Sequence, residues 1–162
     1  MPRKLRAGWF SFTCCEDSTI LFVELLNDKF FEWKERLEFV NAKVLKGKNP
    51  MEQMDVAFVE GAVSSKADEE KVLQIRSLAT KLVAIGACAC TGMPSAQRNS
   101  FDEETKKEIQ FIIDRFNYLP RVEPLKTIVK VDYEVPGCPM DEAKFLAVLD
   151  TIFKDFRGVP DA

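Results

Sequence analysis

Three short, largely apolar runs in this chain are each followed, within three residues, by a cysteine. The runs span residues 7–13, 81–85 and 127–135, and the cysteines that follow them are Cys14 and Cys15, Cys88 and Cys90, and Cys138. Such runs are typical of strands that are buried on both faces of a parallel sheet. Ligands of open α/β sheets lie beyond the carboxyl ends of these strands. The sequence therefore predicts that three strand ends bring their thiols to one site.

The rest of the chain alternates between helical and extended patterns. Helical spacing of apolar residues is found in residues 20–34, 66–80, 101–118 (one helix or a helix pair) and from residue 141 onward, and strand patterns in residues 7–13, 37–45, 54–59, 81–85 and 127–133. The resulting order, β-α-β-β-α-β-α-β-α, is that of a doubly wound sheet. We predict a flavodoxin-like, three-layer α/β fold with a parallel sheet of four or five strands, in a single domain over residues 1–162.

The apolar side chains of the predicted helices are expected to face the sheet. They are Ile20, Val23, Leu26, Phe30 and Phe31 in the first helix, Val72, Ile75, Leu78 and Ala79 in the second, and Phe145, Leu146, Leu149, Ile152 and Phe153 in the last. Ser65, with Asp68 three residues later, resembles a capping box at the start of the second helix. The segment between Gly86 and Gly92, which carries two cysteines, is expected to be a loop.

The composition excludes several classes of function. The net charge is −3 and the Lys and Arg residues are scattered, so the electrostatic footprint of a nucleic-acid-binding protein is missing. No apolar stretch has the length of a signal peptide or the roughly 18 residues of a membrane span, and we expect a cytoplasmic protein. The chain has no histidine, which removes Ser/His/Asp and Cys/His nucleophiles and any zinc site that contains histidine.

The five cysteines are the remaining candidates for chemistry. Their odd number argues against a disulfide framework. A lone cysteine is often only a small buried apolar residue, but cysteines at three strand ends favour a metal or redox site. Four thiolates can hold a 4Fe-4S cluster or a zinc ion, although adjacent cysteines fit poorly with the usual C-x2-C spacing of zinc sites. A zinc or thiol-redox domain remains an alternative, whereas a flavin-binding flavodoxin would need a Ser/Thr/Gly-rich first loop.

Four blocks of the sequence together resemble a known family. The blocks are Phe12-Thr-Cys-Cys15, Val59-Glu-Gly-Ala-Val63, Gly86-Ala-Cys-Ala89 and Pro136-Gly-Cys-Pro139. In order and approximate spacing they resemble the small subunit of nickel-iron hydrogenases and its relative, the cluster-bearing 20 kDa subunit of respiratory complex I. The resemblance covers roughly residues 6–156.

The resemblance implies a flavodoxin-like domain that binds no flavin and holds one 4Fe-4S cluster. Carried over by position, its ligands are Cys14, Cys15, Cys88 and Cys138, and Cys90 is left over, either as a packing residue or in place of Cys14. The chain would be a non-catalytic electron-transfer subunit of an oxidoreductase complex. Its partners would be a large subunit, which in hydrogenases holds the nickel-iron site, and further iron-sulfur or flavin subunits, with any contact to the membrane made through the complex.

Two details leave the choice within the family open. Hydrogenase small subunits usually carry C-x-x-C in the first loop, and Ser18 stands at its second cysteine here, whereas tandem Cys14-Cys15 resembles the complex I subunit. The complex I subunit in turn usually continues Pro-Gly-Cys-Pro with a second proline, where this chain has Met140. The Val-Glu-Gly-Ala-Val block and the absence of membrane anchors favour a hydrogenase module, and the tandem cysteines favour a complex I-like module.

Further residues are candidates for supporting roles. Glu60 could act near the cluster or simply cap backbone N–H groups at its strand end, and Glu16 could move protons at the subunit interface or face a helix dipole. The candidates for the large-subunit interface are Trp9, Phe10, Phe12 and Met93, with core packing as the alternative.

Overall fold

The fold is built on a five-stranded sheet in which every neighbouring pair is parallel. The computed structural model describes residues 3–157. The strands are β1 (Leu5–Ser11), β2 (Leu37–Ala42), β3 (Met54–Glu60), β5 (Ala79–Ile85) and β7 (Tyr133–Val135), in the order β2-β1-β3-β5-β7. The predicted α/β class with a parallel sheet of four or five strands is confirmed.

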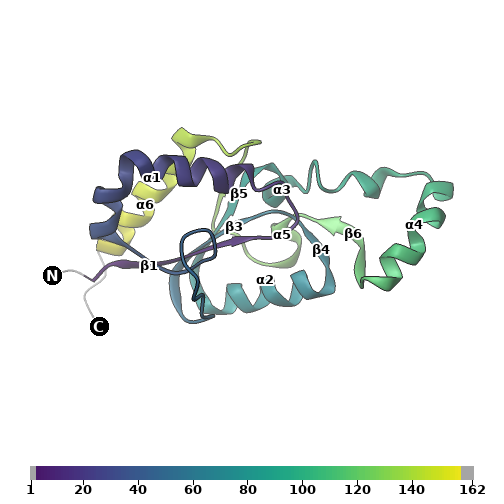
Figure 1. The fold of residues 1–162 in the computed structure, drawn as a ribbon, viewed down its shortest axis with the longest axis horizontal. Helices are drawn as coiled ribbons and strands as arrows, with labels where there is room; N and C mark the ends of the chain where they lie inside the picture. The colour runs from purple at the N-terminus through teal and green to yellow at the C-terminus, as the bar shows by residue number, and fades with distance from the viewer. Residues whose placement is uncertain (1–2, 158–162) are drawn as a thin grey trace.

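Helices cover both faces of this sheet (Figure 1). One face carries α1 (Asp17–Arg36) and α6 (Glu142–Arg157), and the other carries α2 (Lys66–Leu78) and the short α5 (Leu125–Ile128). Successive strand side chains point to opposite faces, so Trp9 packs in the core under α1 and α6 while Phe10 packs in the core on the α2 side. The central strands therefore bury side chains on both faces of the sheet, as we predicted for residues 81–85.

The first helix buries a different face from the one expected. The buried residues of α1 are Ser18, Thr19, Phe22, Leu25 and Trp33. Ile20 is 60% exposed and Phe31 is 80% exposed, and Val23 and Phe30 are exposed as well, so this part of the prediction was wrong. The helix has apolar residues on two faces, and aromatic stacking selects one of them. The ring of Phe22 stacks on Trp9 with centroids 4.2 Å apart and lies against Trp33 at 6.2 Å.

The predictions for the other helices are confirmed where they concern packing and capping. Val72 and Ile75 of α2 are buried, as are Phe145, Leu149, Ile152 and Phe153 of α6. Ser65 and Asp68 form the capping box of α2. The boundary at residue 80 was wrong, because α2 ends at Leu78 and β5 begins at Ala79.

Two segments near the carboxyl edge of the sheet differ from the prediction. Residues 86–92 are not a loop, because Gly86–Thr91 form a short helix, α3, directly after β5. The strand predicted at residues 127–133 is also wrong, since β7 pairs with β5 only over Tyr133–Val135. Just before it, the carboxylate of Asp132 accepts a hydrogen bond from the Leu82 amide, and the Asp132 amide donates to the Leu82 carbonyl at 2.9 Å.

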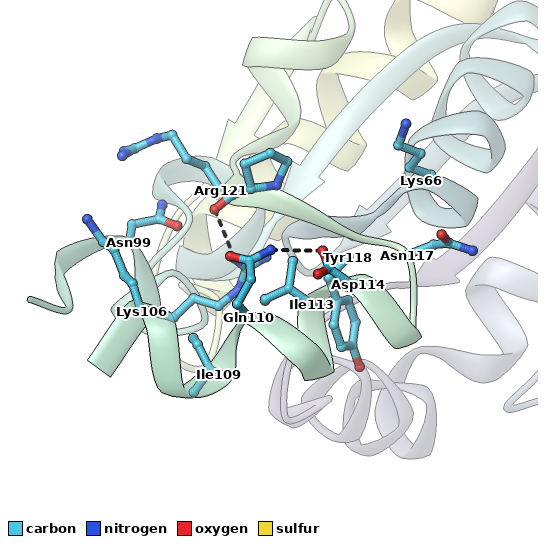
Figure 2. A pocket seen from close by; sticks show the side chains of 12 residues that line it. Lys66, Asn99, Lys106, Ile109, Gln110, Ile113, Asp114, Asn117, Tyr118 and Arg121 are labelled. Atoms are coloured by element: carbon cyan, nitrogen blue, oxygen red, sulfur yellow. Dashed lines mark hydrogen bonds between the residues drawn. The ribbon is translucent and has the colours of Figure 1, made fainter. Parts of the chain in front are cut away.

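An arm that the sequence did not predict as such projects from the carboxyl edge of the sheet (Figure 1). It consists of the 3-10 helix η1 (Gln97–Ser100), α4 (Glu103–Arg115) and β6 (Tyr118–Glu123), and β6 pairs antiparallel with β4 (Val63–Ser65). The guanidinium of Arg98 donates to the carbonyls of Leu119 at 2.6 Å and Pro120 at 3.0 Å, which joins the two sides of the arm. A hollow lies between the two sides of the arm. There the side-chain amide of Gln110 donates a hydrogen bond to the carboxylate of Asp114, also on α4 (Figure 2).

The hydrogen bonds of Asp132 join the segment just before β7 to β5 and α2, and a substitution of Asp132 can test what they contribute to stability. Its carboxylate accepts hydrogen bonds from Leu82 at 2.9 Å and from Arg76 at 2.8 Å. Burial alone would raise the pKa of Asp132, but these two bonds, together with the positive charges of Arg76 and Lys81, outweigh it and the pKa lies below its ordinary value. We expect Asp132→Asn to lower the free energy of unfolding by about 1–3 kcal/mol at neutral pH, measured by urea denaturation.

The pH dependence follows from the lowered pKa. The stabilisation by ionised Asp132 is complete above the ordinary Asp pKa of about 3.9 and is lost as the pH falls through the lower pKa of the folded state. The difference in the free energy of unfolding between the wild type and Asp132→Asn should therefore become smaller in strong acid. Asp28→Asn, at an exposed position on α1, should change stability by less than about 0.5 kcal/mol. An equal loss in both variants would contradict the account.

Candidate functional site

The four cysteines expected as ligands line one small pocket at the carboxyl edge of the sheet. Cys14 and Cys15 follow β1, Cys88 lies in α3 after β5, and Cys138 follows β7. The other lining residues are Asp17, Ser18, Glu60, Ile85, Gly86, Ala87 and Gly137. The pocket lies where α1 and α2 leave for opposite faces of the sheet, which is the switch point at which open α/β sheets bind ligands.

Hydrogen bonds between the three cysteine-bearing segments bring them together. The Ser18 hydroxyl, at the start of α1, accepts a hydrogen bond from the Met140 amide at 3.1 Å. The Ala87 amide, in α3, donates to the Gly137 carbonyl at 2.7 Å. The first bond joins residues 122 positions apart in the sequence, and the second joins residues 50 positions apart. The segment that carries Cys138 is thus held against the other two segments by hydrogen bonds of its own backbone.

Gly86 is required by this close approach. Its φ angle is +80°, in the region that favours glycine, and a Cβ atom there would lie 2.9 Å from the Ser18 hydroxyl oxygen. The glycine that we placed at the end of a strand in the sequence therefore allows α3 to begin beside the first turn of α1.

A buried carboxylate holds the start of α1. Glu60, at the end of β3, is 2% exposed, and it accepts hydrogen bonds from the amides of Ser18 and Thr19 at 3.1 Å each and from the Thr19 hydroxyl at 2.6 Å. The local N-cap residue, Glu16, makes no side-chain cap and has a left-handed backbone with φ of 62°. Glu60 replaces that missing cap from another strand. Glu60 thus caps backbone N–H groups, as one alternative expected, but these belong to α1, 42 and 41 residues away in the sequence, and not to its own strand end.

The thiols differ in their surroundings. Cys14 is half-buried, and burial followed by the nearby Glu60 carboxylate raises its pKa to about 12. Cys138 is exposed, and its thiol donates to the Asp17 carboxylate at 3.2 Å, which raises its pKa to about 11. The buried thiol of Cys88 lies 3.2 Å from the Ser95 hydroxyl. In the absence of bound metal, the raised pKa values of Cys14 and Cys138 favour the protonated form of these two thiols.

Cys90 does not share the pocket. Its side chain is 2% exposed, packs in the core on the α2 side, and its thiol donates to the Ala84 carbonyl at 3.7 Å. Residues two apart on a helix point in nearly opposite directions, so Cys88 and Cys90 leave α3 on different sides. Burial raises the Cys90 pKa to about 11. The packing alternative for Cys90 agrees with this position.

The donor set suits a cofactor that prefers sulfur ligands. Four thiols on three separate segments face one pocket, and Fe–S clusters are held by cysteine thiolates of this kind. Among residues 3–157, no group of three or more His, Cys, Asp or Glu side chains is arranged to hold a single metal ion. The residues present fit an iron-sulfur cluster.

The candidates for a subunit interface divide into two groups. Trp9 and Phe10 are buried in the two cores, so they are unsuited to contact a partner. Phe12 is half-buried, and Met93, just beyond α3, is 48% exposed. Asp17, next to the tandem cysteines, was expected near the cluster, but the sequence did not indicate its bond to a cysteine 121 residues away. Nor did the sequence indicate Ser95 as a neighbour of Cys88.

Comparison with known proteins decides the family. Residues 14–152 match the sequence model described as "NADH ubiquinone oxidoreductase, 20 Kd subunit". The chain belongs to this family. The family includes the small subunits of nickel-iron hydrogenases, and the expected resemblance is confirmed.

Relatives from two organisms show where the chain stands in the 20 kDa subunit family. It is 26% identical to the delta subunit of the NAD-reducing hydrogenase HoxS of Cupriavidus necator, over 92% of this chain and 78% of that protein. It is 30% identical to the delta subunit of sulfhydrogenase 2 of Pyrococcus furiosus, over 96% of this chain but 65% of that protein. A crystal structure of an NAD+-reducing [NiFe]-hydrogenase contains a chain that matches with a TM-score of 0.81 and 25% identity, covering 94% of this chain and 93% of that one.

Within residues 3–157, no helix has both the length and the apolar character needed to cross a bilayer.

The bond between Asp17 and Cys138 predicts a reactivity change. Asp17→Asn removes the negative charge that favours the protonated thiol, so the Cys138 pKa should fall toward its ordinary value. In the reduced, metal-free chain at pH 8, alkylation of Cys138 by iodoacetamide should become about tenfold faster, because the gain in thiolate outweighs its lower nucleophilicity. Mass spectrometry of the alkylated peptide gives the rate. Asp28→Asn removes the same charge farther along α1 and should leave the rate unchanged, and equal rates in all three chains would contradict the assignment.

Proposed function

We propose that this chain is the electron-transfer small subunit of a nickel-iron hydrogenase-type complex, with Cys14, Cys15, Cys88 and Cys138 as ligands of one 4Fe-4S cluster. The observation that carries the proposal is the single pocket lined by four thiols from three strand ends, in a member of this family. The cluster, when bound, would accept and release single electrons. Bond-making chemistry would belong to a large subunit, and the complex would work in the cytoplasm.

The surrounding residues would set the properties of that site. Glu60 fixes the first loop through its bonds to the start of α1, so Cys14 and Cys15 are presented on a rigid turn. Ionised carboxylates at Asp17 and Glu60 would lower the reduction potential, because negative charge opposes the arrival of an electron. Asp17 would lose its bond to the Cys138 thiol once that sulfur is deprotonated for ligation.

The exposed side of the pocket would be covered by the large subunit. Cys15 and Cys138 are exposed, so a cluster held there would meet solvent in the isolated chain. Two exposed apolar side chains stand close in the sequence to the pocket, Ile20 three residues after Asp17 and Met93 just after α3. Exposed apolar side chains suit contact with a protein partner.

A second candidate is a complex I-like module that feeds a membrane-associated partner. Tandem Cys14-Cys15 and the description of the matching family model favour it. The named relatives above, with identities of 26% and 30%, are hydrogenase subunits and favour the first candidate. Nickel in the large subunit that co-purifies with this chain supports the hydrogenase-type complex, and a co-purifying partner without nickel supports the second candidate.

The ligand set can be tested by single substitutions. Cys14→Ser, Cys15→Ser, Cys88→Ser and Cys138→Ser should each lower the iron and acid-labile sulfide content of the chain, purified without oxygen, because each removes a soft anionic ligand. Cys90→Ser is the matched control and should keep the full content, since Cys90 lies in the other core. If Cys90→Ser loses iron and Cys14→Ser keeps it, the fourth ligand is Cys90 and not Cys14. Zinc without sulfide in the wild type would overturn the electron-transfer proposal in favour of a zinc or thiol-redox domain.

A further inference from the structure

A second crevice lies at the carboxyl edge of the sheet, beside the thiol pocket but separate from it. Its volume is about 360 Å³, within the range of small-molecule sites. It is lined by Trp9, Phe10, Ser11, Glu16, Thr19, Asn41, Lys43, Val44 and Lys71. The crevice thus lies between the ends of β1 and β2, the start of α1 and the side of α2, and the cysteines do not line it.

Two lysines reach this crevice from different elements. Lys43 follows the end of β2, and Lys71 is on α2, where its ammonium lies 5.5 Å from the centre of the Phe12 ring. Neither lysine makes an ion pair within 4.0 Å in the part of the chain that the structure describes. Burial, and then the charge of Lys43, lower the pKa of Lys71. The two like charges therefore face a common space at a cost to the folded state.

The nearby carboxylates do not neutralise this pair. Asp68, on the same helix as Lys71, is committed to the capping box, where it accepts hydrogen bonds from the amides of Ser64 and Ser65. Glu16 lines the crevice and is exposed, and it supplies one negative charge against two positive ones. The crevice keeps a net positive charge while the chain as a whole carries −3.

We propose that this crevice binds a phosphate-class oxyanion between Lys43 and Lys71, either free phosphate or the phosphate group of a small molecule. Ammonium groups from two walls can contact different oxygens of one tetrahedral anion, in charge-assisted bonds. Ser11 and Thr19 also line this space, but the Thr19 hydroxyl donates to Glu60 and the Ser11 hydroxyl lies 3.3 Å from that of Thr19, so the two lysines are the groups that would contact the anion. The position agrees with the rule that ligands of open α/β sheets lie beyond the carboxyl ends of the strands. This proposal does not depend on the cluster.

The site lies one side chain away from the thiol pocket. Thr19 lines the crevice, and its hydroxyl donates to Glu60, which lines the thiol pocket. A bound anion would therefore act on the thiol site through Thr19 and Glu60, as well as through its charge.

Titration calorimetry of the full chain at low ionic strength tests the proposal, with inorganic phosphate and adenosine monophosphate as separate probes. We expect saturable binding of at least one probe, and about tenfold weaker binding after Lys43→Gln or Lys71→Gln. Lys107→Gln, an exposed lysine on α4, is the matched control and should bind as the wild type does. Tighter binding of phosphate identifies the free anion as the ligand, and tighter binding of the nucleotide identifies a phosphate carried by a larger molecule.

A thermal melt of each variant excludes unfolding as the cause of lost binding. Both crevice variants should be at least as stable as the wild type, because each removes the repulsion between two lysines. Absence of saturable binding of either probe to the wild type would overturn the proposal. Unchanged affinity in both Lys43→Gln and Lys71→Gln would also overturn it, since binding would then lie elsewhere.

Discussion

The buried carboxylate of Glu60 fixes the end of β3 to the beginning of α1, and the thiol site is assembled around that contact. Two amides at the start of α1 point at Glu60, so the helix needs no local cap and its first turn is held against the sheet. Burying a charge is costly, and three hydrogen bonds to the charged group, each worth about 1.5–3 kcal/mol, offset that cost. Burial still raises the Glu60 pKa above its ordinary value.

The same turn of α1 organises the remaining loops. Because Glu60 occupies the amides of Ser18 and Thr19, the Ser18 hydroxyl is left to hold the Met140 amide in the third cysteine segment. That segment in turn accepts the Ala87 amide of α3 at Gly137. The backbone thus sets the relative positions of the cysteines, while the raised pKa values of Cys14 and Cys138 mean that ligation must release protons. Assembly of a metal centre here should therefore depend on pH.

The sequence was sufficient to predict the sheet and the approach of three strand ends, because burial on both faces leaves an apolar pattern that few other structures share. The sequence was insufficient where contacts between side chains far apart in the chain determine the packing. Phe22 rather than Ile20 faces inward because Trp9 stacks on it, and no spacing rule separates two apolar faces of one helix. The partnership of Asp17 with Cys138, and of Lys43 with Lys71, likewise arises only when elements far apart in the chain pack together. The four ligand positions came from family resemblance, and the pocket supplies a physical reason for them.

We expect the thiol pocket to hold a centre that exchanges one electron at a time. The direct test is a redox titration monitored by electron paramagnetic resonance. The sample is the chain purified without oxygen, together with the subunits that bind it. The account predicts an iron-sulfur signal that appears in a single one-electron step, integrates to about one spin per chain, and disappears from this chain after Cys138→Ser. A chain that carries zinc, or that gives the same signal after Cys138→Ser, would contradict it.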